Sequence, residues 1–115
     1  MRARMSPRAF EPTAWPGGEG EPLGRAAART LAATLGAIAD PTRLRILSLL
    51  AAHEPRPTTV TELVDELDLS QATVSHHLKQ LLEAGLIDVT RSGNWNLYRA
   101  DADAYRGLLR RLDPS

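Results

Sequence analysis

The sequence contains no cysteine. This absence excludes disulfide bonds, thiolate metal sites and redox sensing by cysteine. No apolar run approaches the ~20 residues that a membrane-spanning helix needs. The first residues, MRARMSPRAF, carry arginines but lack the hydrophobic segment of a signal peptide. We therefore expect a cytoplasmic protein that does not interact with a membrane.

Net charge is also absent, because 14 lysines and arginines balance 14 aspartates and glutamates. A neutral chain does not bind nucleic acids indiscriminately, so the distribution of charge matters more than its total. Acidic residues gather at Glu62, Asp65, Glu66 and Asp68. The segment that follows has a slight positive excess, with Lys79, Arg91 and Arg99 against Glu83 and Asp88. On so weak a basic surface, phosphate contacts must also come from hydroxyls, amides and helix N-termini.

The segment Leu69–Gly85, LSQATVSHHLKQLLEAG, predicts an amphipathic helix. Ser70 is a suitable N-cap, and Gly85 stands where a left-handed residue would end the helix. Apolar residues recur at helical spacing and form one stripe. Its members are Val74, Leu78 and Leu81.

The opposite face of this helix carries small and polar side chains, and no acidic residue occurs from Ser70 to Leu82. A solvated surface helix would usually carry charges of both signs, so this pattern favours contact with a polyanion. We call it the reading helix. Its candidate DNA contacts are Ser70, Gln71, Ala72, Thr73, Ser75, His76 and Lys79.

The flanking segments predict a winged helix-turn-helix. A short amphipathic helix over 60–67, with Thr59 or Thr61 as N-cap, comes first, and 68–70 form a tight connection. A strand over 86–91, a turn at 92–94 and a second strand over 95–99 follow the reading helix. This hairpin, the wing, adds the candidate DNA contacts Arg91, Asn94 and Arg99.

The remaining segments predict helices at both ends of one domain, 25–115. Helices are expected over 25–39, over 41–53 and over 102–112. Asp40 and Pro41 suit the cap and first position of the second of these helices. Its expected buried residues are Leu44, Ile46 or Leu47, and Leu50. The predicted fold is mainly α with a β-hairpin wing, in the order helix, helix, helix, helix, strand, strand, helix.

The first 24 residues form a separate N-terminal arm rich in proline and glycine. Its apolar content is too small for independent folding, so we expect it to be flexible. Phe10 and Trp15 are either isolated aromatic residues or anchors that pack the arm onto the domain.

Two segments resemble the ArsR/SmtB family of bacterial repressors. They are ADPTRLRIL, at 39–47, and LSQATVSHHL, at 69–78. The resemblance runs from about Leu31 to the C-terminus. It implies a homodimer built from the first and last helices, which presents two winged motifs to successive major grooves of an operator. It also implies an inducer, usually a metal ion, that releases the DNA.

The chain departs from this family in its sensing residues. Thr61 and Val64 stand where family members with thiolate sites carry cysteines. A second family site uses Asp and His ligands from the last helices, but Asp101–Ser115 contains no histidine. We therefore expect neither family metal site in this chain.

Three histidines remain as weak candidate metal ligands. His77 flanks the apolar stripe, so we expect a structural role with a ring nitrogen bonded to backbone or to a neighbouring helix. His76 points with Lys79 towards the DNA side, and His53 places a favourable charge at a helix end. A site shared across a dimer, made from one histidine and Asp or Glu oxygens, would suit nickel, zinc or cobalt better than soft ions.

Three functions are compatible with the sequence. The leading hypothesis is a homodimeric transcriptional regulator that binds operator DNA. In a second, this chain is the DNA-binding subunit and a separate protein senses the signal. In a third, the winged helix mediates protein–protein contact. Catalysis is disfavoured, because no nucleophile or base accompanies the neighbouring Asp101 and Asp103.

Overall fold

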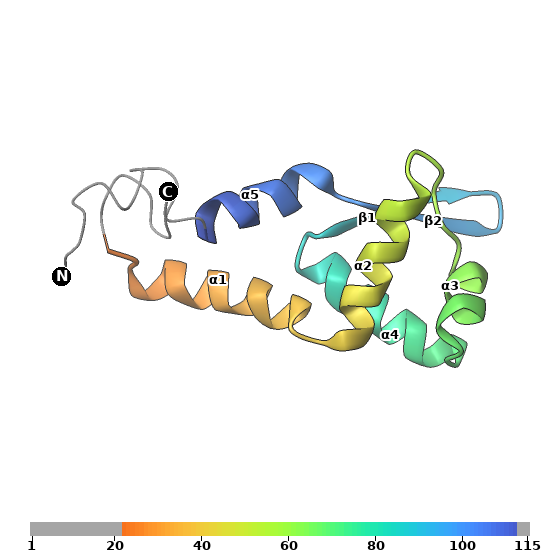
Figure 1. The fold of residues 1–115 in the computed structure, drawn as a ribbon, viewed down its shortest axis with the longest axis horizontal. Coiled ribbons are helices and arrows are strands. Elements are labelled where there is room, and N and C mark those ends of the chain that lie inside the picture. Colours follow the sequence, from red (N-terminus) through yellow and green to blue (C-terminus); the bar gives the residue numbers. More distant parts are fainter. Residues whose placement is uncertain (1–21, 113–115) are drawn as a thin grey trace. The chain divides into compact units, whose positions relative to one another are not determined.

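A computed structural model describes residues 22–112 (Figure 1). The elements are α1 (Arg25–Ile38), α2 (Pro41–His53), α3 (Val60–Leu67), α4 (Gln71–Glu83), β1 (Ile87–Ser92), β2 (Trp95–Ala100) and α5 (Ala102–Leu112). This order confirms the predicted winged helix-turn-helix. Residues 1–21 of the predicted arm, with Phe10 and Trp15, lie outside the described residues.

The chain divides into two compact units. One unit is Thr34–Ala102, which holds α2, α3, α4 and both strands. The described part of the other unit contains most of α1 and α5.

Helix α2 begins as the sequence predicts. The Asp40 carboxylate accepts a hydrogen bond from the Arg43 amide at 3.0 Å, and Pro41 is the first helical residue. The buried side chains of α2 are Ile46, Leu47 and Leu50. Leu44, which we expected to be buried, is 47% exposed, so that expectation was wrong. Successive residues turn by about 100° around a helix, which places Leu44 beyond the edge of the buried face.

Helix α3 begins with a reciprocal pair of hydrogen bonds. Thr59 Oγ1 accepts from the Glu62 amide at 3.2 Å, and Glu62 Oε1 accepts from the Thr59 amide at 3.0 Å. Of the two threonines considered, Thr59 is therefore the cap, and Thr61 lies within the helix. The helix ends at Asp68, whose φ of 56° is left-handed. Aspartate adopts this conformation more readily than most residues, which allows the short connection to α4.

The core of Thr34–Ala102 lies where α2, α3, α4 and the hairpin meet. Its fully buried large side chains are Ile46, Leu50, Leu63, Val74, Leu78, Leu81 and Leu86. The two strands pair antiparallel, with Ile87 opposite Ala100 and Ser92 opposite Trp95. Ile87 and Tyr98 are the buried side chains of the hairpin. One face of the wing is thus fixed to the core.

In the second unit, Leu31 and Leu108 are buried. Tyr105 and Leu109 of α5 are 37% and 52% exposed. The last turn of α5 carries Arg110 and Arg111. No helix in the part of the chain described here is long and apolar enough to cross a membrane.

Candidate nucleic-acid interface

The reading helix is α4, and its ends form as the sequence predicts. Ser70 Oγ accepts from the Thr73 amide at 3.1 Å and donates to Thr73 Oγ1 at 2.9 Å. Gly85 follows the helix with a φ of 74°. The predicted apolar stripe is buried, with Val74 and Leu81 fully inaccessible to solvent.

The other face of α4 is open to solvent. Each predicted contact on this helix is exposed: Ser70, Gln71, Ala72, Thr73, Ser75, His76 and Lys79. The N-terminus of a helix carries partial positive charge and free amide groups, which favour a phosphate. The first two turns of α4 therefore present hydrogen-bonding side chains next to an anion-attracting helix end.

His77 contacts α2, whereas the adjacent His76 is exposed. Arg43 Nε donates to His77 Nδ1 at 3.2 Å, and Arg43 Nη1 donates to the Ala37 carbonyl at 3.1 Å. His77 Nδ1 also lies 3.9 Å from Asp40 Oδ2. These contacts confirm the prediction that a ring nitrogen of His77 bonds to a neighbouring helix.

Asp40 is the acidic member of this group. The hydrogen bond from the Arg43 amide holds the pKa of the Asp40 carboxyl below its usual range, and His77 and the Arg43 side chain lower the pKa further. Asp40 therefore remains ionised at neutral pH and caps α2 in its charged form.

The tip of the wing is organised around Arg91. Its Nε donates to the Gly93 carbonyl at 3.0 Å, and its Nη1 donates to Asn96 Oδ1 at 3.4 Å. Gly93 has a φ of 60°, which suits a tight turn between two strands. Arg91 and Asn94 are both exposed, so the turn presents a cation and an amide.

Arg99, the third predicted wing contact, lies away from the tip. In the register of the two strands, Arg99 lies opposite Asp88, towards the end of the hairpin that is away from the turn. It also lines a shallow depression of ≈ 210 Å³ with Pro57, Thr90 and Leu97. The structure thus separates Arg99, on β2, from Arg91, on β1, along the length of the hairpin.

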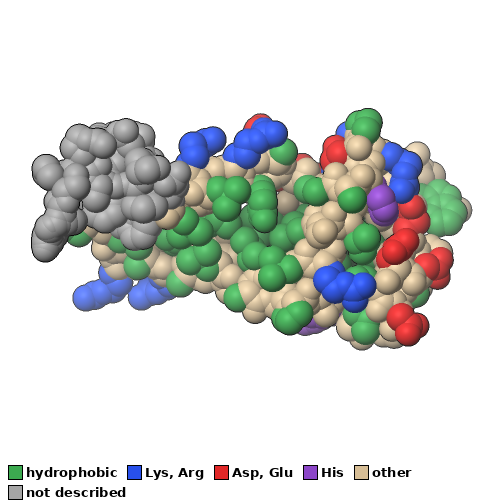
Figure 2. Space-filling view, viewed as in Figure 1, with side chains coloured by type: hydrophobic (Ala, Val, Ile, Leu, Met, Phe, Trp, Pro, Cys, Tyr) green, Lys and Arg blue, Asp and Glu red, His purple; other side chains and the backbone are tan. Residues whose placement is uncertain are grey.

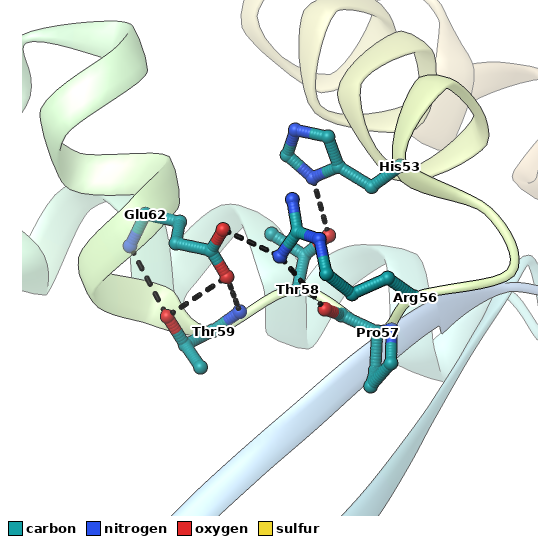
Figure 3. A network of polar contacts seen from close by, with 6 residues as sticks. All are labelled: His53, Arg56, Pro57, Thr58, Thr59 and Glu62. Carbon is teal, nitrogen blue, oxygen red and sulfur yellow. Dashed lines mark hydrogen bonds and ion pairs between the residues drawn. The ribbon is translucent and has the colours of Figure 1, made fainter.

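Sequence reasoning missed a group of polar contacts at the connection between α2 and α3 (Figure 3). His53 Nδ1 lies 2.7 Å from Oγ1 of Thr58, a fully buried residue. The Thr58 amide donates to the Tyr98 carbonyl at 2.9 Å, and the Tyr98 amide donates back at 2.8 Å. His53 is in the last turn of α2, as expected, but its contact with Thr58 has no signature in the sequence.

The same group of contacts includes an ion pair between Arg56 and Glu62, with 2.7 Å between Nη1 and Oε2. The Thr59 amide and, to a smaller extent, Arg56 hold the pKa of Glu62 below its usual range. Figure 2 shows acidic side chains gathered over α3, where Asp65, Glu66 and Asp68 are exposed. The acidic surface therefore belongs to α3, whereas the exposed face of α4 has no acidic side chain before Glu83.

Comparisons with known proteins agree with this geometry. Residues 38–90 match a family described as a helix-turn-helix domain. The chain is 40% identical over 77 residues to an uncharacterized HTH-type transcriptional regulator of Methanocaldococcus jannaschii, covering 67% of this chain and 84% of that protein. It is 31% identical over 85 residues to an arsenical resistance operon repressor of Staphylococcus xylosus, covering 74% and 79%.

A solved structure is also similar to this chain. It is a homodimeric winged helix-turn-helix DNA-binding domain from Mycobacterium bovis, described as a possible ArsR-family regulator. The identity is 28% and the TM-score 0.64, over 72% of this chain and 75% of that one. The chain belongs to the ArsR/SmtB family. It is therefore a DNA-binding transcriptional regulator of the winged helix-turn-helix class.

Because the ArsR/SmtB resemblance implies metal sites, the possible metal ligands of this chain are relevant. Among residues 22–112, no group of three or more histidines and carboxylates is placed to hold a metal ion. His53 contacts Thr58, His77 contacts Arg43, and His76 is exposed on α4. At the family's thiolate positions on α3, Thr61 is exposed and Val64 is half-buried.

Proposed function

We propose that this ArsR/SmtB family member acts as a homodimer that reads a specific operator, with α4 in the major groove and the wing against the DNA backbone. The observation that carries the proposal is the division of α4 into two faces. Val74, Leu78 and Leu81 are buried, while Gln71 and Ser75 are exposed on a face free of acidic residues. The first turns of such a helix contact base edges in helix-turn-helix proteins.

The exposed side chains of α4 suggest separate roles. Gln71 can form paired hydrogen bonds with adenine, and the Ala72 methyl suits contact with a thymine methyl. Thr73, Ser75 and His76 supply further hydrogen-bonding groups in the same two turns. Lys79 and the wing residues Arg91, Asn94 and Arg99 would contact phosphates, which position the protein without reading sequence.

Dimerisation through α1 and α5 is the second part of the proposal. The homodimeric state of the Mycobacterium bovis domain supports a dimer. Tyr105 and Leu109 leave exposed apolar surface on α5, which a second copy would cover. The two reading helices of such a dimer would meet successive turns of the operator. A regulator that acts on this DNA would be located in the cytoplasm.

The residues of this chain also bear on the signal that controls DNA binding. Relatives are named as arsenical resistance repressors, but this chain has no cysteine to supply thiolate ligands. We propose that it lacks both metal sites of the family. Control then comes from a separate sensor protein or from nickel, zinc or cobalt at an unusual site that includes His53, His76 or His77. A catalytic role is not part of the proposal, because the similar proteins are transcriptional regulators.

The test is binding of the purified protein to DNA from upstream of its own gene, measured by fluorescence anisotropy against a scrambled duplex. Gln71→Ala is expected to cost about 1–3 kcal/mol of binding free energy and to relax base preference at one position. Lys79→Ala is the matched control, since it should weaken binding to all sequences and reduce the salt slope by about 0.9.

Two results would contradict the proposal. Equal affinity for the operator and the scrambled duplex would favour a winged helix that mediates protein–protein contact. Unchanged affinity and base preference in both Gln71→Ala and Ser75→Ala would show that another face of α4 reads the DNA.

A further inference from the structure

Trp95 is the most exposed large hydrophobic residue in the part of the chain described, with 58% of its surface accessible. It begins β2 and pairs with Ser92 directly beside the Gly93–Asn94 turn. Figure 2 shows hydrophobic surface projecting at the position of this turn. We propose that Trp95 is a DNA-contact residue whose indole ring packs against the sugars of the minor-groove wall. This inference rests on the proposed function and adds an apolar contact to it.

The charge around Trp95 favours DNA as the occupant. No acidic residue occurs from Val89 to Ala100, and the nearest ones in sequence are Asp88 and Asp101. Arg91 is held at the same tip by the Gly93 carbonyl. A polyanion is attracted to such a surface, whereas exposed acidic side chains lie on α3.

The hairpin register places the indole and the guanidinium on opposite faces of the wing. Cross-strand partners share a face and neighbours along a strand alternate. Trp95 therefore lies with Ser92 on one face, and Arg91 lies with Asn96 on the other. The buried Tyr98 fixes the second face to the core, whereas Ser92 and Trp95 are both exposed at the tip of the first face. The tip of the wing can then present the Trp95 ring from one face and the Arg91 cation from the other to the same sugar–phosphate strand of the DNA.

An indole suits the sugar–phosphate backbone chemically. Its ring offers apolar area to deoxyribose, and its single N–H can donate to a phosphate oxygen. Apolar side chains at minor-groove contacts are a known device of DNA-binding proteins. Trp95 directly follows Asn94 in the turn, so the proposed contact extends the wing surface that Asn94 and Arg91 already form.

The roles of Trp95 and Arg91 can be distinguished by how operator affinity depends on salt concentration. An apolar contact releases no condensed counterions, whereas loss of one phosphate contact reduces the salt slope by about 0.9. Trp95→Ala should lower operator affinity about tenfold, near the lower end of the range known for aromatic side chains stacked on bases, with an unchanged slope. Arg91→Ala should lower both the affinity and the slope. Trp95→Phe should retain most of the affinity.

Fluorescence gives a direct measurement, because Trp15 is the only other tryptophan of the sequence. In Trp15→Phe, the emission reports Trp95 alone. We expect acrylamide to quench this emission strongly in the free protein and weakly at saturating operator. Val89→Ala, at another exposed apolar position of the hairpin, controls for changes in wing stability and should retain operator affinity.

Three results would overturn the inference. Unchanged quenching at saturating operator, or wild-type affinity in Trp95→Ala, would show that Trp95 does not contact DNA. Weak quenching in the free protein would show that another copy or another segment already covers the ring. If the wild-type protein itself fails to bind its upstream DNA, the proposed function fails, and this result is distinguishable from the loss of the Trp95 contact alone.

Discussion

Arg43 Nε donates a hydrogen bond to His77 Nδ1 across 3.2 Å, so a side chain of α2 holds the reading helix α4. The same guanidinium donates to the Ala37 carbonyl, which anchors it at the α1 end that belongs to this unit. Adjacent helical residues point about 100° apart, so fixing His77 against α2 directs His76 towards solvent. The orientation of the exposed face of α4 therefore depends on a contact between distant parts of the sequence.

The two histidines should respond differently to substitution. His77→Ala removes an acceptor from Arg43 in a half-buried position and should lower the free energy of unfolding by about 0.5–1.5 kcal/mol. His76→Ala should leave stability unchanged and lower operator affinity, because His76 is exposed on the reading face. Urea unfolding and DNA titration of both variants measure the two effects. A stability loss in His76→Ala equal to that in His77→Ala would contradict this division.

Local signals explain which features the sequence could predict. The caps Asp40 and Ser70, and the left-handed Gly85, depend on contacts within a few residues and were predicted correctly. The contacts Arg43–His77 and His53–Thr58 depend on how helices meet or on a loop path, and nothing in the periodicity identifies Arg43 or Thr58 as partners.

The error at Leu44 has a related origin. Apolar periodicity marks several residues of α2, but the packing of α3, α4 and the hairpin decides which side of the helix is buried. Ile46 and Leu50 face that packing, and Leu44 does not. Trp95 illustrates the converse case, since its exposure depends on the hairpin register rather than on its residue type.

The proposed dimer predicts a specific effect at α5. Leu109 is 52% exposed, and a charge there would be desolvated if a second copy covered it. Leu109→Asp should convert the protein from twice the chain mass to the chain mass in light scattering at micromolar concentration. Leu44→Asp is the control, because Leu44 is similarly exposed on α2, outside the predicted interface. A wild-type monomer that binds its operator tightly would contradict the dimer.

Metal binding should be weak. Without thiolates, and with no group of three histidines or carboxylates placed to hold an ion among residues 22–112, divalent ions should bind no tighter than about micromolar. Calorimetry with nickel, zinc and cobalt on the purified dimer measures this affinity. A nanomolar site that releases DNA and is abolished by replacing His53, His76 or His77 would contradict the prediction and assign sensing to this chain. Micromolar binding without DNA release would favour a separate sensor protein.

Acid should destabilise the protein through two caps. The pKa values of Asp40 and Glu62 are lowered in the folded state by hydrogen bonds from the Arg43 and Thr59 amides. A lowered folded-state pKa gives stability that is fully present above the unfolded-state values, about 3.9 for Asp and 4.3 for Glu, and is lost as the pH falls through the folded-state pKa.

The expected result is a fall in the free energy of unfolding below about pH 4 that is shallower in Asp40→Asn and Glu62→Gln. The side-chain amides introduced by these two substitutions keep an acceptor for the caps but lose the titrating charge. Asp65→Asn, an exposed change on α3 outside the capping pair, should keep the wild-type pH profile. Urea unfolding at fixed protein concentration between pH 3 and 7 measures the profiles, since the stability of a dimer varies with concentration. Equal profiles in all four proteins would show that neither cap contributes through its charge.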